Sequence, residues 1–166
     1  MRAVIVGCGR VGATVAQALA TAGHEVTIVD LLTRSFDRLP ATFGGNAVRG
    51  DGTDEDTLRR AGAEGADLFI SLTEGDNRNV MAAQLAVEAL GIGRVFAKVN
   101  DPVRAQAYAE LGIGTICRTT MLADALLGAL GQAGSGESSV REGTGHPHAA
   151  VPAAAVPAAA VPAREG

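Results

Sequence analysis

Three glycines near the start of the chain have the spacing of a phosphate-binding turn. Gly7, Gly9 and Gly12 form the pattern G-x-G-x-x-G, directly after the apolar run at residues 3–6 and directly before an alanine-rich helical segment. In such a turn the first glycine permits a tight bend, the second lets the backbone approach a pyrophosphate, and the third lets helix and strand pack closely. The helix that follows would point its free N–H groups at the phosphates. The pattern therefore predicts a phosphate-bearing ligand.

The residues between these glycines are Cys8, Arg10 and Val11, and we include them in the predicted cofactor-binding turn. A guanidinium at Arg10 would add charge-assisted hydrogen bonds to phosphate oxygens, for a terminal phosphate of ATP as readily as for a dinucleotide bridge. The alternative is a solvated arginine at a helix start, where the dipole makes a cation mildly unfavourable. Cys8 is expected to be a small buried residue that fills the turn rather than a nucleophile.

An acidic residue ends the second predicted strand at the position that commonly binds a ribose. Asp30 follows Gly12 by 18 residues, and its carboxylate would accept hydrogen bonds from ribose hydroxyls. This carboxylate would repel a 2′-phosphate. No arginine follows it directly to bind such a phosphate, since the next one, Arg34, comes four residues later. The sequence therefore favours NAD(H) or an adenine nucleotide over NADP(H). The alternative is an acid at a strand end in solvent.

Further polar residues follow the ends of the later strands. Asp51 is expected either to face an adenine edge or to cap the next helix, for which Asp54 is the better placed. Because open parallel sheets bind ligands at the carboxyl ends of their strands, we expect the other polar residues there to form the second half of a cleft. These residues are Thr73, Asp76, Asn77, Asn79 and Lys98.

The elements that would position these residues alternate along the chain. Strands apolar on both faces, separated by helical segments, predict a Rossmann-type doubly wound α/β fold with a parallel sheet of about six strands. The first helix is expected to bury Val11, Val15, Ala18, Leu19 and Ala22. The predicted strands are at residues 3–6, 25–30, 46–51, 66–71, 94–99 and 114–117. The predicted helices are at residues 11–22, 33–39, 54–61, 76–90, 102–111 and 119–130.

The composition changes near Gly131, which divides the chain into a nucleotide-binding domain at residues 1–131 and a low-complexity tail at residues 132–166. Pro147, Pro152, Pro157 and Pro162 recur every five residues among alanine and valine, so we expect this tail to be disordered. The pair His146 and His148 lacks a third ligand nearby, and no metal site is predicted.

Charge and composition exclude several other classes of protein. The net charge of −4 argues against a nucleic-acid partner, which requires a basic face. No apolar stretch approaches the roughly 20 residues of a membrane span, and the start of the chain lacks a signal-peptide pattern. Cys8 and Cys117 have neither the number nor the spacing of a disulfide framework. We therefore expect a protein of the reducing cytoplasm.

Several of these motifs occur together, in an order that resembles a known family. The ordered set looks like the N-terminal domain called KTN or RCK-N (TrkA-N), over residues 2 to about 130. It comprises the glycine turn with Arg10, the strand-end Asp30, the pair Gly50-Asp51, the spacing T-x-x-D-x-x-N from Thr73 to Asn79, and "NDP" at residues 100–102.

The resemblance implies a regulator of potassium transport rather than a catalyst. Members of this family bind NAD(H) or ATP/ADP, dimerise, and control a membrane transporter or channel from the inner face of the plasma membrane. By this resemblance Gly7, Gly9, Arg10, Gly12, Asp30, Asp51 and Thr73 contact the nucleotide. Residues 112–127 resemble the last strand and dimer-crossing helix of the family. The apolar side chains there could serve a homodimer, a related regulatory subunit, or the domain's own sheet. Many members continue into a second small α/β domain, and we expect the tail to take its place here.

The sequence leaves two other functions open. An NAD-dependent oxidoreductase would need a proton donor or acceptor near its substrate, and the domain offers His24, Lys98 and Tyr108. His24 is predicted at the opposite edge of the sheet, and Lys98 and Tyr108 do not have the Tyr-x-x-x-Lys spacing. The other alternative is a stand-alone nucleotide-binding interaction module. We predict that the protein is not an enzyme.

Overall fold

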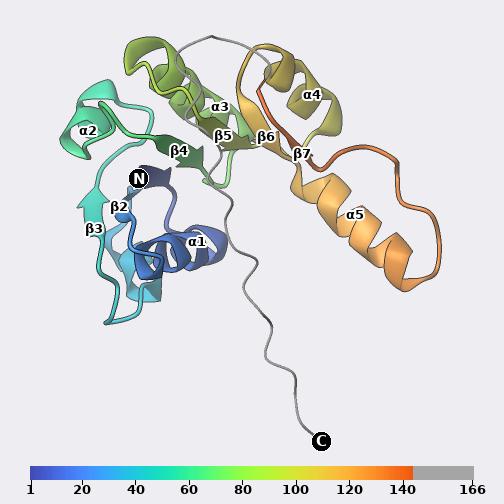
Figure 1. The fold of residues 1–166 in the computed structure, drawn as a ribbon, viewed down its shortest axis with the longest axis horizontal. Coiled ribbons are helices and arrows are strands. Elements are labelled where there is room, and N and C mark those ends of the chain that lie inside the picture. Colours follow the sequence, from blue (N-terminus) through green and yellow to red (C-terminus); the bar gives the residue numbers. More distant parts are fainter. Residues whose placement is uncertain (144–166) are drawn as a thin grey trace, which may run out of the picture.

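A mostly parallel sheet forms the centre of the molecule, in the order β3-β2-β1-β4-β5-β6-β7 (Figure 1). The computed structural model describes residues 1–143 of the chain. The order reverses between β1 and β4, which confirms the doubly wound Rossmann-type fold. The strands are β1 (Arg2–Val6), β2 (Glu25–Asp30), β3 (Asn46–Arg49), β4 (Leu68–Ser71), β5 (Val95–Lys98), β6 (Gly114–Ile116) and β7 (Val140–Arg141).

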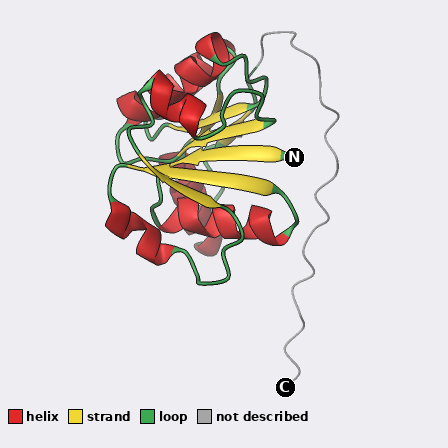
Figure 2. Ribbon diagram, turned by 90° about the vertical axis from the view of Figure 1, so that its left-hand side faces the viewer, coloured by secondary structure: helices red, strands yellow, loops and turns green. Residues whose placement is uncertain are grey.

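Helices cover both faces of this sheet (Figure 2). α1 (Arg10–Thr21) and the 3₁₀ helix η1 (Thr33–Arg38) pack on one face with an apolar cluster around Ile5 and Ile28. On the other face, α2 (Glu55–Arg60), α3 (Asp76–Gln84) and α4 (Pro102–Glu110) pack around Phe69. The helix predicted at residues 76–90 is not uniform, because its last turn is a π-helix, η2 (Leu85–Ala89), in which Leu90 N–H donates to the carbonyl of Leu85.

The buried face of α1 differs from the prediction. Gly12, Ala13 and Ala16 are its buried residues, whereas Val11 is 63% exposed, and Ala18 and Ala22 are also exposed. Val15 and Leu19 are half-buried, as an apolar stripe requires. The helix packs through its smallest side chains because it lies very close to the turn before it. Alanine-rich segments therefore mark a helix without marking which face is buried.

The seventh strand lies inside the segment that was predicted to be a disordered tail. Val140 and Arg141 pair antiparallel with Ile116 and Thr115 of β6, so the prediction is wrong for these residues. Two residues are too few to show a strand period in the sequence, and they pair because β6 presents an unpaired backbone edge. The tail prolines, His146 and His148 lie outside the described residues.

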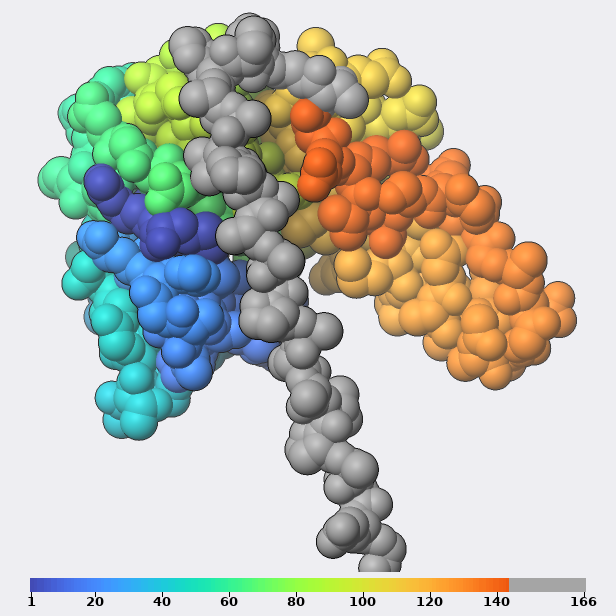
Figure 3. All heavy atoms as spheres, in the orientation of Figure 1, coloured from blue at the N-terminus to red at the C-terminus, as the bar shows by residue number. Residues whose placement is uncertain are grey.

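The last helix, α5 (Arg118–Ala129), extends away from the rest of the domain (Figures 1 and 3). Within the described chain its only buried residue is Thr120. The apolar side chains predicted from the sequence as its stripe, Met121, Leu122, Leu126 and the adjoining Leu130, are all exposed. Among residues 1–143, no helix is both long enough and apolar enough to cross a membrane.

Candidate functional site

A cleft of about 340 Å³ opens where the strand order reverses, at the carboxyl ends of β1, β2 and β4. This is the position at which open α/β sheets bind ligands, and the volume lies near the lower end of the roughly 300–1,000 Å³ typical of small-molecule sites. The cleft is lined by Val6, Gly7, Cys8, Gly9, Val29, Asp30, Leu31, Leu32, Ser35, Arg38, Gly50, Asp51, Gly52, Leu72, Thr73, Glu74 and Arg78.

The three glycines of the turn are required for different reasons. Gly7 has a φ of +104°, and a Cβ there would lie 2.9 Å from the carbonyl carbon of Leu72. A Cβ on Gly12 would lie 2.0 Å from the carbonyl oxygen of Gly7, so the close packing of α1 requires a glycine. Gly9 differs from both, because its φ of −78° suits any residue and no atom of the described chain lies within 4 Å of its ideal Cβ. The packing of the domain explains two glycines, and Gly9 leaves open space at the cleft.

Asp30 holds the loops at the β2 side of the cleft together. One carboxylate oxygen accepts a hydrogen bond from the backbone N–H of Cys8 at 2.8 Å, and the other accepts from that of Leu32 at 2.9 Å. The side chain still lines the cleft, and each oxygen keeps a second lone pair. Asp30 therefore supports the glycine turn, and its contact with a ribose stays a prediction.

Cys8 is the buried residue of the glycine turn, and it packs in the apolar cluster around Ile5 and Ile28. Its side chain is fully buried, and burial, followed by the nearby charge of Asp30, raises the pKa of the thiol. The charge of Arg38 opposes this rise. A thiol with a raised pKa stays protonated near neutral pH and is a poor nucleophile. The expectation of a small buried residue is confirmed.

Asp51 and Thr73 also lie in the wall of the cleft. The backbone N–H and hydroxyl of Thr53 both donate to one oxygen of Asp51, at 2.9 and 2.8 Å, and these hydrogen bonds lower the pKa of Asp51. Asp54 caps α2 by accepting from the N–H of Thr57, as expected from its position. Capping is therefore not the role of Asp51, whose ionised carboxylate faces the cleft.

Asn79 cannot contact a ligand in this structure, contrary to the prediction. It is fully buried, and its Oδ1 accepts from the N–H and the hydroxyl of Thr73, both at 2.7 Å. Its Nδ2 donates to the carbonyls of Thr73 at 3.1 Å and Lys98 at 2.9 Å. The hydrogen bonds of the amide are thus spent within the fold, where they hold the Thr73 loop against the end of β5.

Asp76 and Lys98 lie outside the lining of the cleft in residues 1–143, so of the predicted second half Thr73 lines the cleft and these two residues do not. The carboxylate of Asp76 accepts from the backbone N–H of Asn100 at 2.9 Å and from its Nδ2 at 2.8 Å. β4 separates β5 from β1, which places Lys98, at the end of β5, away from the strand-order reversal. Asp76 instead joins the start of α3 to the loop before α4.

The side chains of Arg10 and Val11 lie beside the cleft rather than in its described lining. Arg10 is the first residue of α1 and is exposed, and the neighbouring Val11 is exposed as well. Arg10 therefore belongs to the first turn of α1, whose backbone N–H groups have no partner within the helix. The phosphate contact of Arg10 stays a prediction.

Arg38 and Arg78 line the cleft and were missed by the sequence analysis. They follow the ends of β2 and β4 by eight and seven residues, too far to be counted as strand-end residues. A possible signal is the place of Arg78 in the first turn of α3, where a cation opposes the helix dipole and gains nothing from the helix itself. Ser35, which is buried, and Glu74 complete the polar lining.

The glycine turn, the reversal of strand order and the acidic end of β2 define a Rossmann-type domain of the nucleotide-binding class. The profile of the TrkA-N domain matches residues 3–119, which is more than half of the chain. The chain belongs to the TrkA-N domain family, and the resemblance seen in the sequence is confirmed.

Relatives and solved structures agree with this assignment. A relative from Streptomyces coelicolor, described as the Trk system potassium uptake protein TrkA, is 47% identical over 127 residues, covering 76% of this chain and 57% of that protein. The chain thus spans little more than half the length of that relative. The TrkA-N domain of the inner membrane protein ybaL from Escherichia coli has the same fold, with a TM-score of 0.69 and 20% identity over 78% of this chain and 96% of that one. The Kef C-terminal domain of Shewanella denitrificans in its AMP-bound form follows, with a TM-score of 0.62 and 24% identity over 80% of this chain and 83% of that one.

Proposed function

We propose that this domain is the nucleotide-sensing part of a regulatory subunit of a potassium uptake system. It binds NAD(H) or ATP/ADP in the cleft and controls a membrane potassium transporter or channel. The observation that carries the proposal is the open space at Gly9, because the fold itself does not require a glycine there and a ligand backbone contact does. The name of the Streptomyces relative and the AMP bound to the Shewanella domain support it.

The cleft suits a ligand that joins two walls of the domain. Asp30 and the loop after it form the wall on the β2 side, and Thr73 belongs to the wall on the β4 side. A nucleotide that contacts both walls favours the conformation in which they are close. Regulation requires that two ligands favour different conformations, since a ligand with equal affinity for both shifts nothing.

Binding rather than catalysis fits the placement of the groups that transfer protons. His24 directly precedes β2, at the edge of the sheet opposite the cleft. Tyr108 lies on α4, where Arg104 is 5.8 Å from the centre of its ring. Neither residue lines the cleft, so an oxidoreductase is the weaker alternative.

The exposed helix α5 favours assembly with a second regulatory subunit, either another copy or a related chain. A helix of 12 residues is marginal in water unless it packs against something. Its exposed leucines and Met121 offer an apolar surface for such packing. A Leu126→Glu variant should run at lower mass than the wild type in light scattering after gel filtration, and an unchanged mass would remove α5 from the interface. The assembled protein would act in the cytoplasm, at the inner face of the membrane that holds the transporter.

Calorimetric titration with NADH, NAD, ATP and ADP tests the central claim. We expect at least one of them to bind in the micromolar range, which corresponds to about −8 kcal/mol. Potassium uptake by cells that express the transporter should then depend on this chain. If none of the four binds at millimolar concentration, the proposed function is wrong. Oxidation of NADH with a carbonyl substrate would favour the enzyme instead.

A further inference from the structure

Two arginines stand on different walls of the cleft without any role in the proposal above. Arg38 comes from η1, which follows β2, and Arg78 comes from the first turn of α3, which follows β4. Because β2 and β4 flank β1 on its two sides, these arginines belong to elements on either side of the glycine turn.

Neither guanidinium forms a salt bridge within the described chain. The salt bridges within residues 1–143 join Arg59 to Glu55 and Glu64. The one side-chain hydrogen bond of Arg38 is long, from Nη1 to the carbonyl of Ser35 at 3.4 Å. A cation that lines a cleft and forms no salt bridge in the fold is available for an anionic ligand.

The charges of both arginines nevertheless reach the cleft. The pKa of the Cys8 thiol is raised by its burial and by Asp30, and Arg38 acts against that rise. The pKa of Asp51 is lowered mainly by its hydrogen bonds with Thr53, and Arg78 adds to this effect. Each guanidinium therefore acts on a different part of the cleft.

The cleft also contains three carboxylates, Asp30, Asp51 and Glu74. These acids alone would repel a ligand that carries several phosphate charges. The two arginines offset most of this charge, and the effect on a ligand grows with the number of its phosphates.

We propose that Arg38 and Arg78 set the ligand preference of this cleft by donating to the 5′-phosphate oxygens of an adenine nucleotide. The preferred ligand class is then an adenine mononucleotide with two or three phosphates, over AMP and over a dinucleotide, whose bridging phosphates carry less charge. This inference rests on the proposed function, and it concerns which nucleotide the same site selects.

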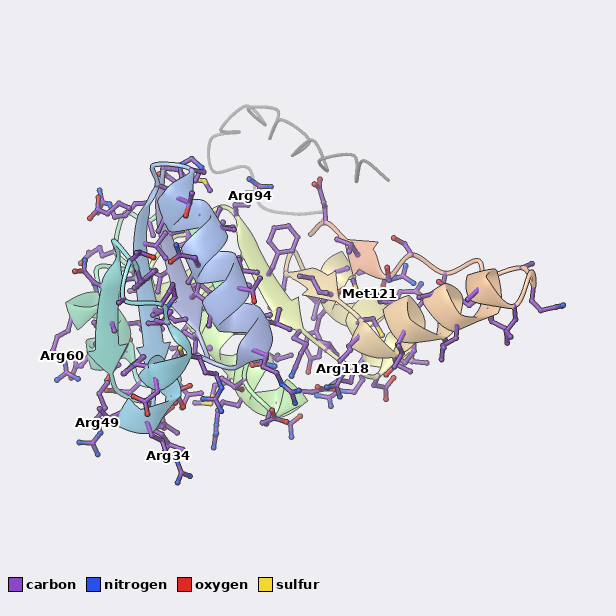
Figure 4. The ribbon with its side chains drawn as sticks, turned by 90° about the horizontal axis from the view of Figure 1, so that it is seen from below. Arg34, Arg49, Arg60, Arg94, Arg118 and Met121 are labelled. Atoms are coloured by element: carbon purple, nitrogen blue, oxygen red, sulfur yellow. The ribbon has the colours of Figure 1, made fainter. Side chains whose placement is uncertain are left out.

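The test compares Arg38→Gln and Arg78→Gln with Arg34→Gln by calorimetry with ATP, ADP, AMP, NADH and NADPH, at low and high salt. Arg34 is the matched control, because it lies on η1 with Arg38 and points outward into solvent, away from the cleft (Figure 4). Since the three arginines are exposed, all variants should keep the thermal midpoint of the wild type.

We expect each cleft variant to weaken ATP binding about tenfold or more, ADP binding less, and AMP binding by about twofold. The salt dependence of ATP binding should decrease in the same variants. Arg38→Lys should keep part of the affinity, because it keeps the charge and loses the planar fork. Arg34→Gln should change each affinity by less than about twofold.

Three outcomes would overturn the inference. The cleft variants could bind ATP as Arg34→Gln does, or they could lose the same factor for AMP, ADP and ATP. A loss confined to NADPH relative to NADH would instead assign Arg38 to a 2′-phosphate. If the wild-type protein binds ATP and the variants do too, the inference alone fails; if the wild type binds no nucleotide, the proposed function fails with it.

Discussion

Two groups of polar residues follow the carboxyl ends of strands in this sheet, and they differ in whether they face a cleft or bind other parts of the protein. At the carboxyl ends of β1, β2 and β3, Asp30 and Asp51 line an open cleft, and Gly9 leaves space there. At the edge formed by β4 and β5, Asn79 is buried, and it and Asp76 spend their hydrogen bonds on the protein itself. A ligand can be bound at the first edge, while the second edge fastens loops to each other.

This difference shows what separates a binding residue from a structural one in such a fold. Both are polar and both follow a strand, so residue type and position do not distinguish them. The distinction is whether the donors and acceptors are already satisfied inside the protein. Thr73 stands at the boundary, since its N–H and hydroxyl bind Asn79 while the residue lines the cleft.

The largest effect should come from removing Asn79. Asn79→Ala leaves the N–H of Thr73 and the carbonyl of Lys98 without their buried partner, and we expect a loss of about 3 kcal/mol in the free energy of unfolding. Urea unfolding measures it. Asn46→Ala, at an exposed position of β3, is the control and should change little. An Asn79→Ala variant as stable as that control would mean that the hydrogen bonds of Asn79 with Thr73 and Lys98 do not stabilise the fold.

Gly9 and Gly12 separate binding from folding within a single turn. Gly9→Ala should fold with the stability of the wild type to within about 0.5 kcal/mol and bind nucleotide about tenfold more weakly, because its methyl group enters open space at the cleft. Gly12→Ala should lose about 2 kcal/mol of stability, since its Cβ would meet the carbonyl of Gly7. Denaturant unfolding and calorimetry on both variants give the comparison. Equal affinity in Gly9→Ala and the wild type would contradict the role of the turn.

Much of the fold follows from the sequence because its signals are local. The apolar runs of β1 and β2, the glycine spacing and Asp30 are recognisable in a few consecutive residues. Arg38, at the end of η1, and Arg78, in the first turn of α3, line the cleft without directly following a strand, so the strand-end pattern does not mark them. The burial of Asn79 depends on the distant end of β5, and the buried face of α1 depends on the close approach of the helix to Gly7. These features arise from packing between elements.

Asp76→Ala should have an intermediate effect that is confined to stability. The variant removes the hydrogen bonds to Asn100 and an acid from the start of α3, and we expect a loss of about 1.5 kcal/mol. Nucleotide affinity should stay within about twofold of the wild type, because Asp76 lies outside the described lining of the cleft. Unfolding and calorimetric measurements on the same variant decide whether Asp76 is a structural residue or a ligand contact. A tenfold loss of affinity with little loss of stability would restore Asp76 as a ligand contact.

The smallest effect should be the pH dependence contributed by Asp51. Hydrogen bonds from Thr53 hold its pKa in the folded protein below the value of about 3.9 expected in the unfolded chain. A carboxylate with a lowered folded pKa stabilises the protein fully above its unfolded pKa, and this contribution disappears as the pH falls through the folded pKa. The stability difference between the wild type and Asp51→Asn should therefore be constant from neutral pH to about pH 5 and shrink below about pH 4. Urea unfolding of both proteins across this range measures the difference. A difference that stays constant or grows on acidification would show that the Thr53 hydrogen bonds do not favour the ionised form, and that Asp51 faces the cleft without this support.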